Sequence, residues 1–210
     1  MRALVIYCHP SSQSFTAAVR DVVVDKLRKA GAATEVIDLY AEGFDARLSP
    51  EEWACYIDGP KADCPRMPHI DALKAADTLI FVYPTWWYGM PAVLKGWLDR
   101  VLLPDVAFHL PPDGPITPGL RHIKRLGVFT TCGASWWLTR FIGAPGRRTL
   151  LRGLRLLCAR RTRTAFCAHY SMDASTADSR ARHLRRVAVS MDRLIGRPRD
   201  GAAETAPARA

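Results

Sequence analysis

The sequence predicts a single α/β domain, in which a parallel β-sheet is covered by helices on both faces. Apolar runs that are typical of buried strands alternate along the chain with segments of helical periodicity. The 210 residues suit one domain, and 49% of them are hydrophobic, so the chain can form a sizeable core. No apolar run approaches the roughly 18 residues that a membrane-spanning helix needs.

Five strands are expected. The first, ALVIYC, is apolar throughout, which is typical of a strand buried on both faces, and it is too short to be a signal peptide. The other four are also bounded by polar, glycine or proline residues. The expected strands are residues 3–8, 34–40, 78–83, 125–131 and 162–170.

Helices are expected between these strands. Ser49, Pro50 and Glu52 form a capping pattern that predicts a short helix ending near Tyr56. Residues 59–68 are expected to form a loop, and the tail 197–210, which lacks hydrophobic periodicity, is expected to be disordered beyond a domain of residues 1–196. The other expected helices are residues 15–30 (stopped by Gly31), 70–76, 92–102 and 175–195.

Two parallel-sheet architectures compete. The dinucleotide-binding version places G-x-G-x-x-G after the first strand, whereas this turn reads CHPSSQSFT and contains no glycine. The flavodoxin-like version needs only five strands, in the order 2-1-3-4-5. Strand number and turn composition therefore favour a flavodoxin-like three-layer sandwich.

In that order strands 1, 3 and 4 are neighbours, and ligands bind beyond their carboxyl ends. The segment 9–16 offers hydroxyl groups at a helix N-terminus, which favours a phosphate. The segment 84–89 offers flat aromatic surface, and the segment 130–137 combines hydroxyl groups with Gly133, where a backbone can approach a ligand closely. The three segments together predict a pocket for a planar, phosphorylated cofactor.

The helix after the aromatic turn has a strong apolar stripe. Leu94, Trp97, Leu98 and Val101 recur at helical spacing, so burial in the core or at an interface explains them. The aromatic residues 86–88 precede the helix and have no such explanation. The turn is therefore the expected functional part.

The stretch YPTWWYGMPAVLKGWLDRVL closely resembles the signature of the flavodoxin-2 family of NAD(P)H:quinone reductases. ALVIYCHPSSQSFT resembles that family's first strand and flavin-phosphate loop, and GVFTTCG resembles its T-T-G-G turn. The resemblance covers roughly residues 1–195 and is loose over 41–70 and 140–165.

The resemblance implies a flavin-dependent NAD(P)H oxidoreductase that reduces quinones or similar flat acceptors by two electrons in a ping-pong reaction. It also implies FAD, with FMN as the alternative, and a homodimer in which both subunits line each site. The implied cofactor-binding residues are His9, Ser14, Phe15, Thr16, Pro84, Thr85, Trp86, Trp87, Tyr88, Thr130, Thr131, Cys132 and Gly133. The expected substrate-pocket residues are Phe108, His109, Trp136 and Trp137.

Some positions depart from the family's pattern. Leu138 and Ala144 stand where mammalian quinone reductases carry a Tyr and a His that are thought to assist proton movement. Phe108 and Leu110 stand near the tyrosine pair of the quinone slot, and Cys132 replaces the first glycine of the T-T-G-G turn. No catalytic residue is therefore assigned.

Two other functions remain open. A protein of this fold can serve as an ancillary subunit of a potassium-efflux-type membrane system. A nucleic-acid binder is suggested by charge alone, because the net charge is +10 and residues 121–210 carry 19 Lys and Arg against 5 Asp and Glu. The Arg-rich stretches lack interleaved aromatic residues, so no nucleic-acid partner is expected, and membrane contact is at most peripheral.

The six cysteines are scattered and form no CxxC pair. This spacing indicates neither a metal site nor a disulfide framework. A reducing cytoplasm is the expected location.

Overall fold

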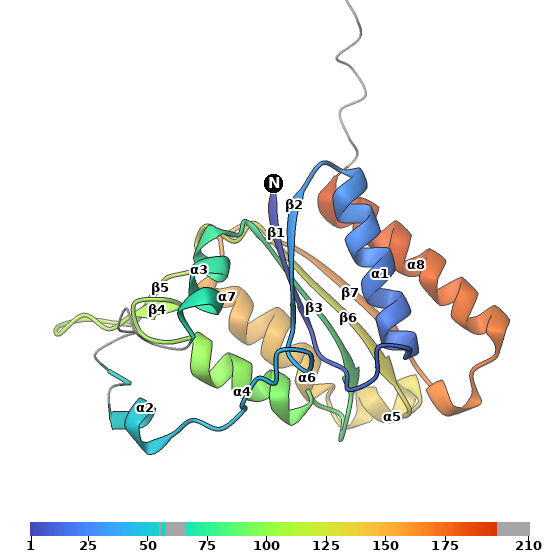
Figure 1. The fold of residues 1–210 in the computed structure, drawn as a ribbon, viewed down its shortest axis with the longest axis horizontal. Helices are drawn as coiled ribbons and strands as arrows, with labels where there is room; N and C mark the ends of the chain where they lie inside the picture. The colour runs from blue at the N-terminus through green and yellow to red at the C-terminus, as the bar shows by residue number, and fades with distance from the viewer. Residues whose placement is uncertain (55, 58–65, 197–210) are drawn as a thin grey trace, which may run out of the picture.

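The computed structural model describes residues 1–54, 56–57 and 66–196. Its centre is a five-stranded parallel sheet of order β2-β1-β3-β6-β7 (Figure 1). Counted along the chain, these strands have the order 2-1-3-4-5, so the predicted flavodoxin-like topology is confirmed. The strands are β1 (Arg2–Tyr7), β2 (Ala33–Asp38), β3 (Thr78–Thr85), β6 (Arg125–Cys132) and β7 (Arg163–His169).

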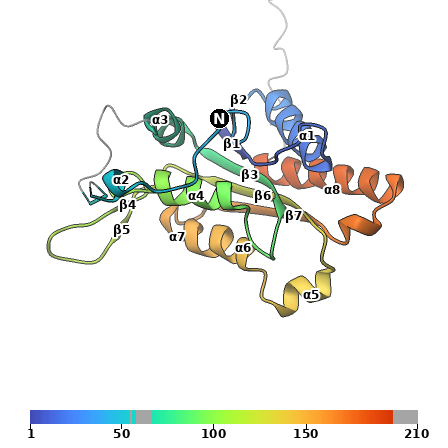
Figure 2. The ribbon, with the colours of Figure 1, turned by 60° about the horizontal axis from the view of Figure 1, so that its bottom comes forward.

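Helices cover both faces of the sheet, and each face has its own apolar core (Figure 2). On one face lie α1 (Phe15–Lys29) and α8 (Ala177–Ile195). On the other lie α3 (Met67–Ala75), α4 (Ala92–Val101) and a helical segment made of α6 (Pro145–Arg148), the π-helix η1 (Thr149–Leu154) and α7 (Arg155–Leu157).

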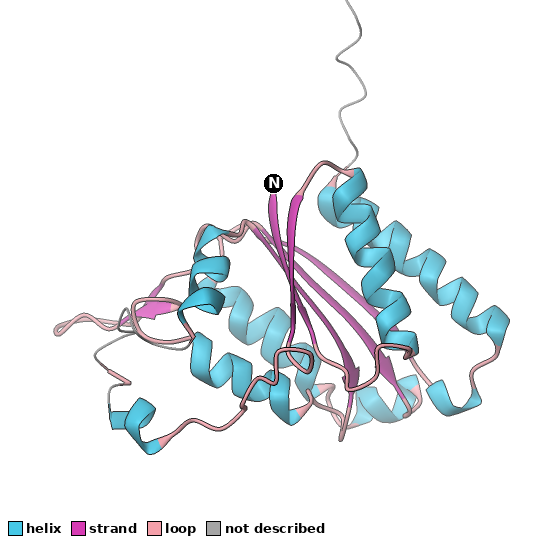
Figure 3. Ribbon diagram, in the orientation of Figure 1, coloured by secondary structure: helices cyan, strands magenta, loops and turns pink. Residues whose placement is uncertain are grey.

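The remaining elements are short (Figure 3). The sequence did not predict the hairpin of β4 and β5 or the helices between residues 136 and 157. For these helices the reason is the π-helical turn η1, which breaks the 3.6-residue periodicity that would have indicated a helix. The short elements are α2 (Pro50–Ala54), β4 (Phe108–His109), β5 (Thr117–Pro118), α5 (Trp136–Phe141) and the 3₁₀-helix η2 (Met172–Ala174).

The predicted capping pattern of α2 is confirmed. Ser49 Oγ accepts from the Glu52 amide at 3.1 Å, and the Ser49 amide donates to Glu52 Oε2 at 3.0 Å. The helix ends at Ala54, two residues before the expected end. Most of the expected loop 59–68, and the whole tail 197–210, lie outside the described residues; α3 already begins at Met67.

The apolar stripe of α4 is buried within the chain. Trp97 is fully buried and its Nε1 donates to His69 Nδ1 at 2.9 Å. On the exposed face, Lys95 Nζ lies 2.6 Å from Asp99 Oδ1. Core burial therefore explains this stripe, without an interface. In the described part of the chain, no helix has the length and apolar character needed to cross a membrane.

Candidate functional site

The ends of β3 and β6 bring two of the three expected loops to one edge of the sheet. β3 runs two residues further than expected, so Pro84 pairs with Thr131 and Thr85 with Cys132. The hydroxyl oxygens of Thr85 and Thr130 lie 2.8 Å apart. This bond between neighbouring strands fixes both turns relative to each other.

The third loop leads from β1 into α1. Ser14 caps α1, since its Oγ accepts from the Ala17 amide at 3.1 Å. Thr16 is buried, and its Oγ1 lies 2.9 Å from Thr131 Oγ1, which ties α1 to β6. The amides of Phe15 and Thr16 belong to the first helical turn and have no partner within the helix. These amides make the start of α1 suitable for an anion.

His9 lies in the same loop and is held by the backbone. His9 Nδ1 lies 2.9 Å from the Ser11 amide nitrogen and 3.1 Å from the Ser11 carbonyl oxygen. Burial lowers the pKa of His9. The ring is therefore neutral at neutral pH.

The aromatic turn is a tight hairpin with a strained backbone. Trp86 and Gly89 exchange two backbone hydrogen bonds, of 3.2 and 2.9 Å. Between them Trp87 and Tyr88 have φ angles of 47° and 62°, the left-handed region that bulky residues avoid. This is the geometry of a type I′ turn, in which Asn-Gly is the favoured pair. Trp87 is 94% exposed, so packing within the chain does not account for it.

A cavity of about 840 Å³ opens at this edge of the sheet, and its size is typical of small-ligand sites. Nine of the expected cofactor-binding residues line it, from all three loops: His9, Pro84, Thr85, Trp86, Trp87, Tyr88, Thr131, Cys132 and Gly133. Four further lining residues were not expected there: Ala134, Leu138, Met172 and Asp173.

The other four expected cofactor-binding residues do not line the cavity with their side chains. Ser14 and Thr16 are engaged in the bonds described above. The Phe15 ring packs against the rings of His169 and His183, with centroids 5.4 and 5.8 Å away. Thr130 lines a narrow neighbouring cavity instead.

None of the four expected substrate-pocket residues lines the cavity. Phe108 and His109 lie in β4, beyond the far end of α4, whose ten residues span about 15 Å. Trp136 faces a separate groove on the other side of α5, and Trp137 is 75% exposed. Among the described residues of one chain, the Trp and Tyr side chains that line the cavity all come from the turn 86–88.

Asp173 is the most informative residue that the sequence analysis missed. A Cβ added at Gly133 would lie 3.0 Å from Asp173 Oδ2, so this carboxylate closely approaches the Gly133 backbone. Asp173 follows β7, whose carboxyl end lies at the same edge as those of β3 and β6. The sequence signal that could have identified Asp173 was the presence of a polar residue shortly after the last predicted strand.

Cys132 behaves as a small buried residue. It is 3% exposed, and its Sγ lies 3.7 Å from Thr139 Oγ1 in α5. Within the described ranges, no three His, Cys, Asp or Glu side chains are grouped so that they could hold a metal ion.

A parallel sheet of this order, with a ligand-sized cavity where the direction of winding reverses, defines a flavodoxin-like protein. The sequence model of the Flavodoxin_2 family, described as a flavodoxin-like fold, matches residues 1–188. The chain therefore belongs to the Flavodoxin_2 family.

The chain is also similar to characterised proteins. It is 31% identical over 126 residues to ribosyldihydronicotinamide dehydrogenase [quinone] of Pongo abelii, a match that covers 52% of this chain and 54% of that protein. The match thus spans about half the length of the relatives from Pongo abelii and Homo sapiens.

Solved structures have the same fold. An NAD(P)H:quinone oxidoreductase from Methanothermobacter marburgensis is 25% identical, with a TM-score of 0.77 over 92% of this chain and 96% of that one. An FMN-dependent NADH-azoreductase from Bacillus anthracis, in complex with FMN, has a TM-score of 0.71 over 93% of this chain and 100% of that one. Its identity of 16% supports the fold alone.

Proposed function

We propose that this protein is a flavin-dependent NAD(P)H oxidoreductase that reduces quinones or similar flat acceptors. The observation that carries this proposal is the cavity at the carboxyl edge of the sheet, with the exposed, strained Trp87-Tyr88 turn on one side. A flat aromatic wall there matches a planar ring better than any other ligand shape. The names of the relatives from Pongo abelii and Methanothermobacter marburgensis support the same reaction class.

The residues present fit a flavin. The unpaired amides at the start of α1 suit the phosphate of its side chain. The turn 84–88 and the backbone of Thr131 and Gly133 border the space for its ring. FAD is our proposed cofactor and FMN the alternative; the relative from Bacillus anthracis uses FMN.

The bound flavin would supply the transfer of hydride and electrons. The chain's own residues would position the partners and exclude water. Leu138 lines the cavity with an apolar side chain, at the position where mammalian quinone reductases carry a tyrosine that is thought to assist proton movement. His9 is neutral and held by the backbone, so its ring is suited to orient a ligand and not to act as a strong acid.

A homodimer belongs to this proposal. The stripe of α4 is buried, whereas α5 carries a group of exposed apolar side chains, in which Phe141 is 89% and Trp137 75% exposed. Exposed apolar surface of this kind is typical of an interface. A second subunit could also bring Phe108 and His109 to the cavity, which one chain cannot do.

We also propose that the protein works in the cytoplasm. The four cysteines that the structure describes (Cys8, Cys132, Cys158 and Cys167) are free thiols. Free thiols suit a reducing compartment.

The deciding experiment is the absorbance spectrum of the purified protein, followed by uptake of added FAD and FMN and chromatography of the flavin released on unfolding. We expect a yellow protein, or one that takes up flavin at micromolar concentration and then oxidises NAD(P)H in the presence of a quinone. Failure to take up either flavin would overturn the proposal.

A further inference from the structure

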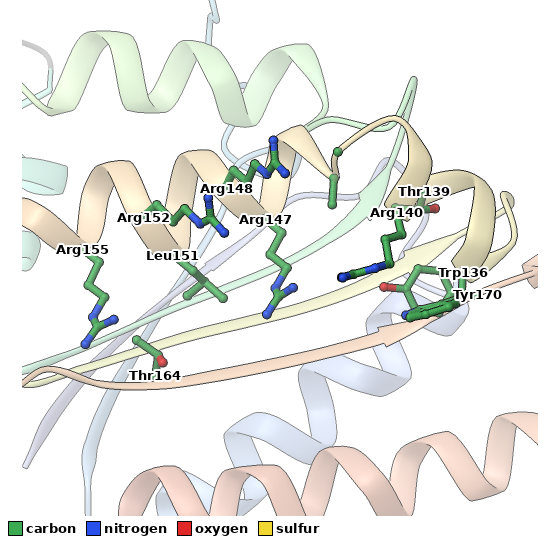
Figure 4. A pocket seen from close by; sticks show the side chains of 12 residues that line it. Trp136, Thr139, Arg140, Arg147, Arg148, Leu151, Arg152, Arg155, Thr164 and Tyr170 are labelled. Atoms are coloured by element: carbon green, nitrogen blue, oxygen red, sulfur yellow. The ribbon is translucent and has the colours of Figure 1, made fainter.

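An arginine-rich groove lies on the other side of α5 from the cavity (Figure 4). Its volume is about 490 Å³, within the range of small-ligand sites. In Figure 4 the side chains of Arg147 and Arg155 extend from the helical segment toward β7, and that of Arg140 reaches from α5 toward Arg147. The groove is defined by five arginines: Arg140, Arg147, Arg148, Arg152 and Arg155.

The local sequence provides these arginines with no counter-charge. Between Asp113 and Asp173 the chain contains no Asp or Glu. Within the described residues, the arginines that form ion pairs with carboxylates are not those of the groove. They are Arg20, Arg47, Arg66, Arg100 and Arg125. Like charges that line one groove repel one another, over a range set by the screening length of about 8 Å at physiological salt. An anion in the groove would relieve that repulsion.

The groove is shaped for a small ligand with an aromatic part. Trp136 is 47% exposed and lines one end together with Tyr170, while the Arg140 guanidinium lies 5.8 Å from the centre of the Trp136 ring. Guanidinium groups bind phosphates through paired hydrogen bonds, and indole rings stack on bases. The groove is concave, contains cations that bind phosphate and has an aromatic end. These features favour a phosphorylated nucleotide as its ligand over a flat charged surface.

The groove is adjacent to the candidate flavin cavity. α5 separates the two, with Leu138 facing the cavity and Trp136 and Arg140 facing the groove. A small cavity of about 20 Å³ shares lining residues with both, Tyr88 with the flavin cavity and Arg147 with the groove.

We propose that the groove binds the adenosine phosphate end of the electron donor and so selects NADPH over NADH. The inference rests on the proposed function in one respect, namely that the donor is a nicotinamide dinucleotide. NADPH differs from NADH by the 2′-phosphate, a dianion that the guanidinium groups of the groove, which form no ion pair with a carboxylate of the described residues, can bind through paired hydrogen bonds.

The test is calorimetric titration of the full-length protein with adenosine 2′,5′-bisphosphate and with adenosine 5′-monophosphate, with and without added flavin. We expect the bisphosphate to bind at least 10-fold more tightly. The double variant Arg152→Gln/Arg155→Gln should lose at least 10-fold of that affinity. Its matched control, Arg182→Gln/Arg185→Gln, removes the same charge from exposed positions of α8 on the opposite face of the sheet and should lose less than 2-fold.

The outcomes separate this inference from the proposed function. Loss of flavin uptake with retained, arginine-dependent bisphosphate binding would overturn only the proposed function. Flavin uptake with equal affinity for the two nucleotides, or with equal losses in the two double variants, would overturn the groove assignment. Binding to vesicles of anionic phospholipid that requires Arg152 and Arg155, without nucleotide binding, would also overturn it and assign the groove to a membrane surface.

Discussion

Replacing Trp87 by Asn tests whether the strained backbone of the turn holds an aromatic side chain in place for ligand binding. Trp87 has a φ of 47°, and the left-handed conformation costs an ordinary residue about 1–2 kcal/mol. Asn adopts this conformation readily and is favoured at this position of a type I′ turn. Because Trp87 is 94% exposed, the substitution removes almost no packing. We therefore expect the flavin-free protein to gain about 1 kcal/mol, which raises Tm by about 2–4 °C in a chain of this length.

The same substitution should weaken flavin binding. Stacking of an aromatic side chain on a flat ring contributes about 1–2 kcal/mol, so Kd should rise roughly 5- to 30-fold. Differential scanning fluorimetry of the flavin-free protein and titration of flavin fluorescence measure the two effects separately. Trp53→Asn is the matched control, since Trp53 is 67% exposed on α2 and away from the cavity, and it should change flavin affinity less than 2-fold. His122→Asn should likewise spare flavin binding.

Two results would refute this reasoning. A lower Tm in the flavin-free Trp87→Asn protein would mean that the indole makes a stabilising contact. A flavin Kd within 2-fold of the unchanged protein would mean that the turn is not a wall of the flavin site.

Four further predictions follow from the site and its surroundings. Steady-state kinetics should give parallel double-reciprocal lines, because nicotinamide and acceptor would share one slot; intersecting lines would require two separate pockets. The pH–rate profile should show no inflection at the ordinary histidine pKa of 6.5, since burial lowers the pKa of His9; a rate that rises or falls with a midpoint near pH 6.5 would contradict this. Light scattering should give a dimer mass, and Phe141→Asp, on the exposed face of α5, should shift it toward the monomer, whereas an unchanged mass would exclude α5 from the interface. Burial lowers the pKa of His183 to about 3 from an ordinary 6.5, so between these pH values the unfolded chain binds more protons and stability falls as the pH falls. From pH 7 to 5 the contribution of His183 to this loss should be about 2 kcal/mol in urea unfolding, and His183→Gln, which can still accept the hydrogen bond from Arg186, should remove that part. The lowered pKa values of His9, His69 and His169 leave a smaller slope in the variant, and an unchanged slope would contradict the assignment.

The strands of the sheet were predictable because they are local features of the sequence. The three central strands are buried on both faces, which needs a continuous apolar run, and all five predicted segments form strands. Their order followed from strand number and from the missing glycines after β1. The helices from 136 to 157 were not predictable in this way, because short helices and a π-helical turn leave no regular apolar period.

At the site, the sequence by itself determined which three loops meet, since carboxyl ends of neighbouring parallel strands share one edge of the sheet. Only the tertiary structure decided which side chains face the cavity. Thr16 bonds to Thr131 and Phe15 packs on His169, so neither side chain is available to a ligand, although both stand in the expected loop. Asp173 approaches Gly133 only because β7 lies beside β6.

The arginine groove shows most clearly what the sequence determined and what only the tertiary structure decided. The sequence determined the charge: no Asp or Glu stands between residues 113 and 173, so the basic excess of this half of the chain has no partner nearby in the sequence. The tertiary structure decided where that charge acts. The segment 145–157 buries Leu150 and Leu154 against the sheet, and its exposed positions include Arg147, Arg148, Arg152 and Arg155. Burial of the two leucines holds the segment against the sheet and leaves these arginines at the surface, where they line one groove beside the cavity.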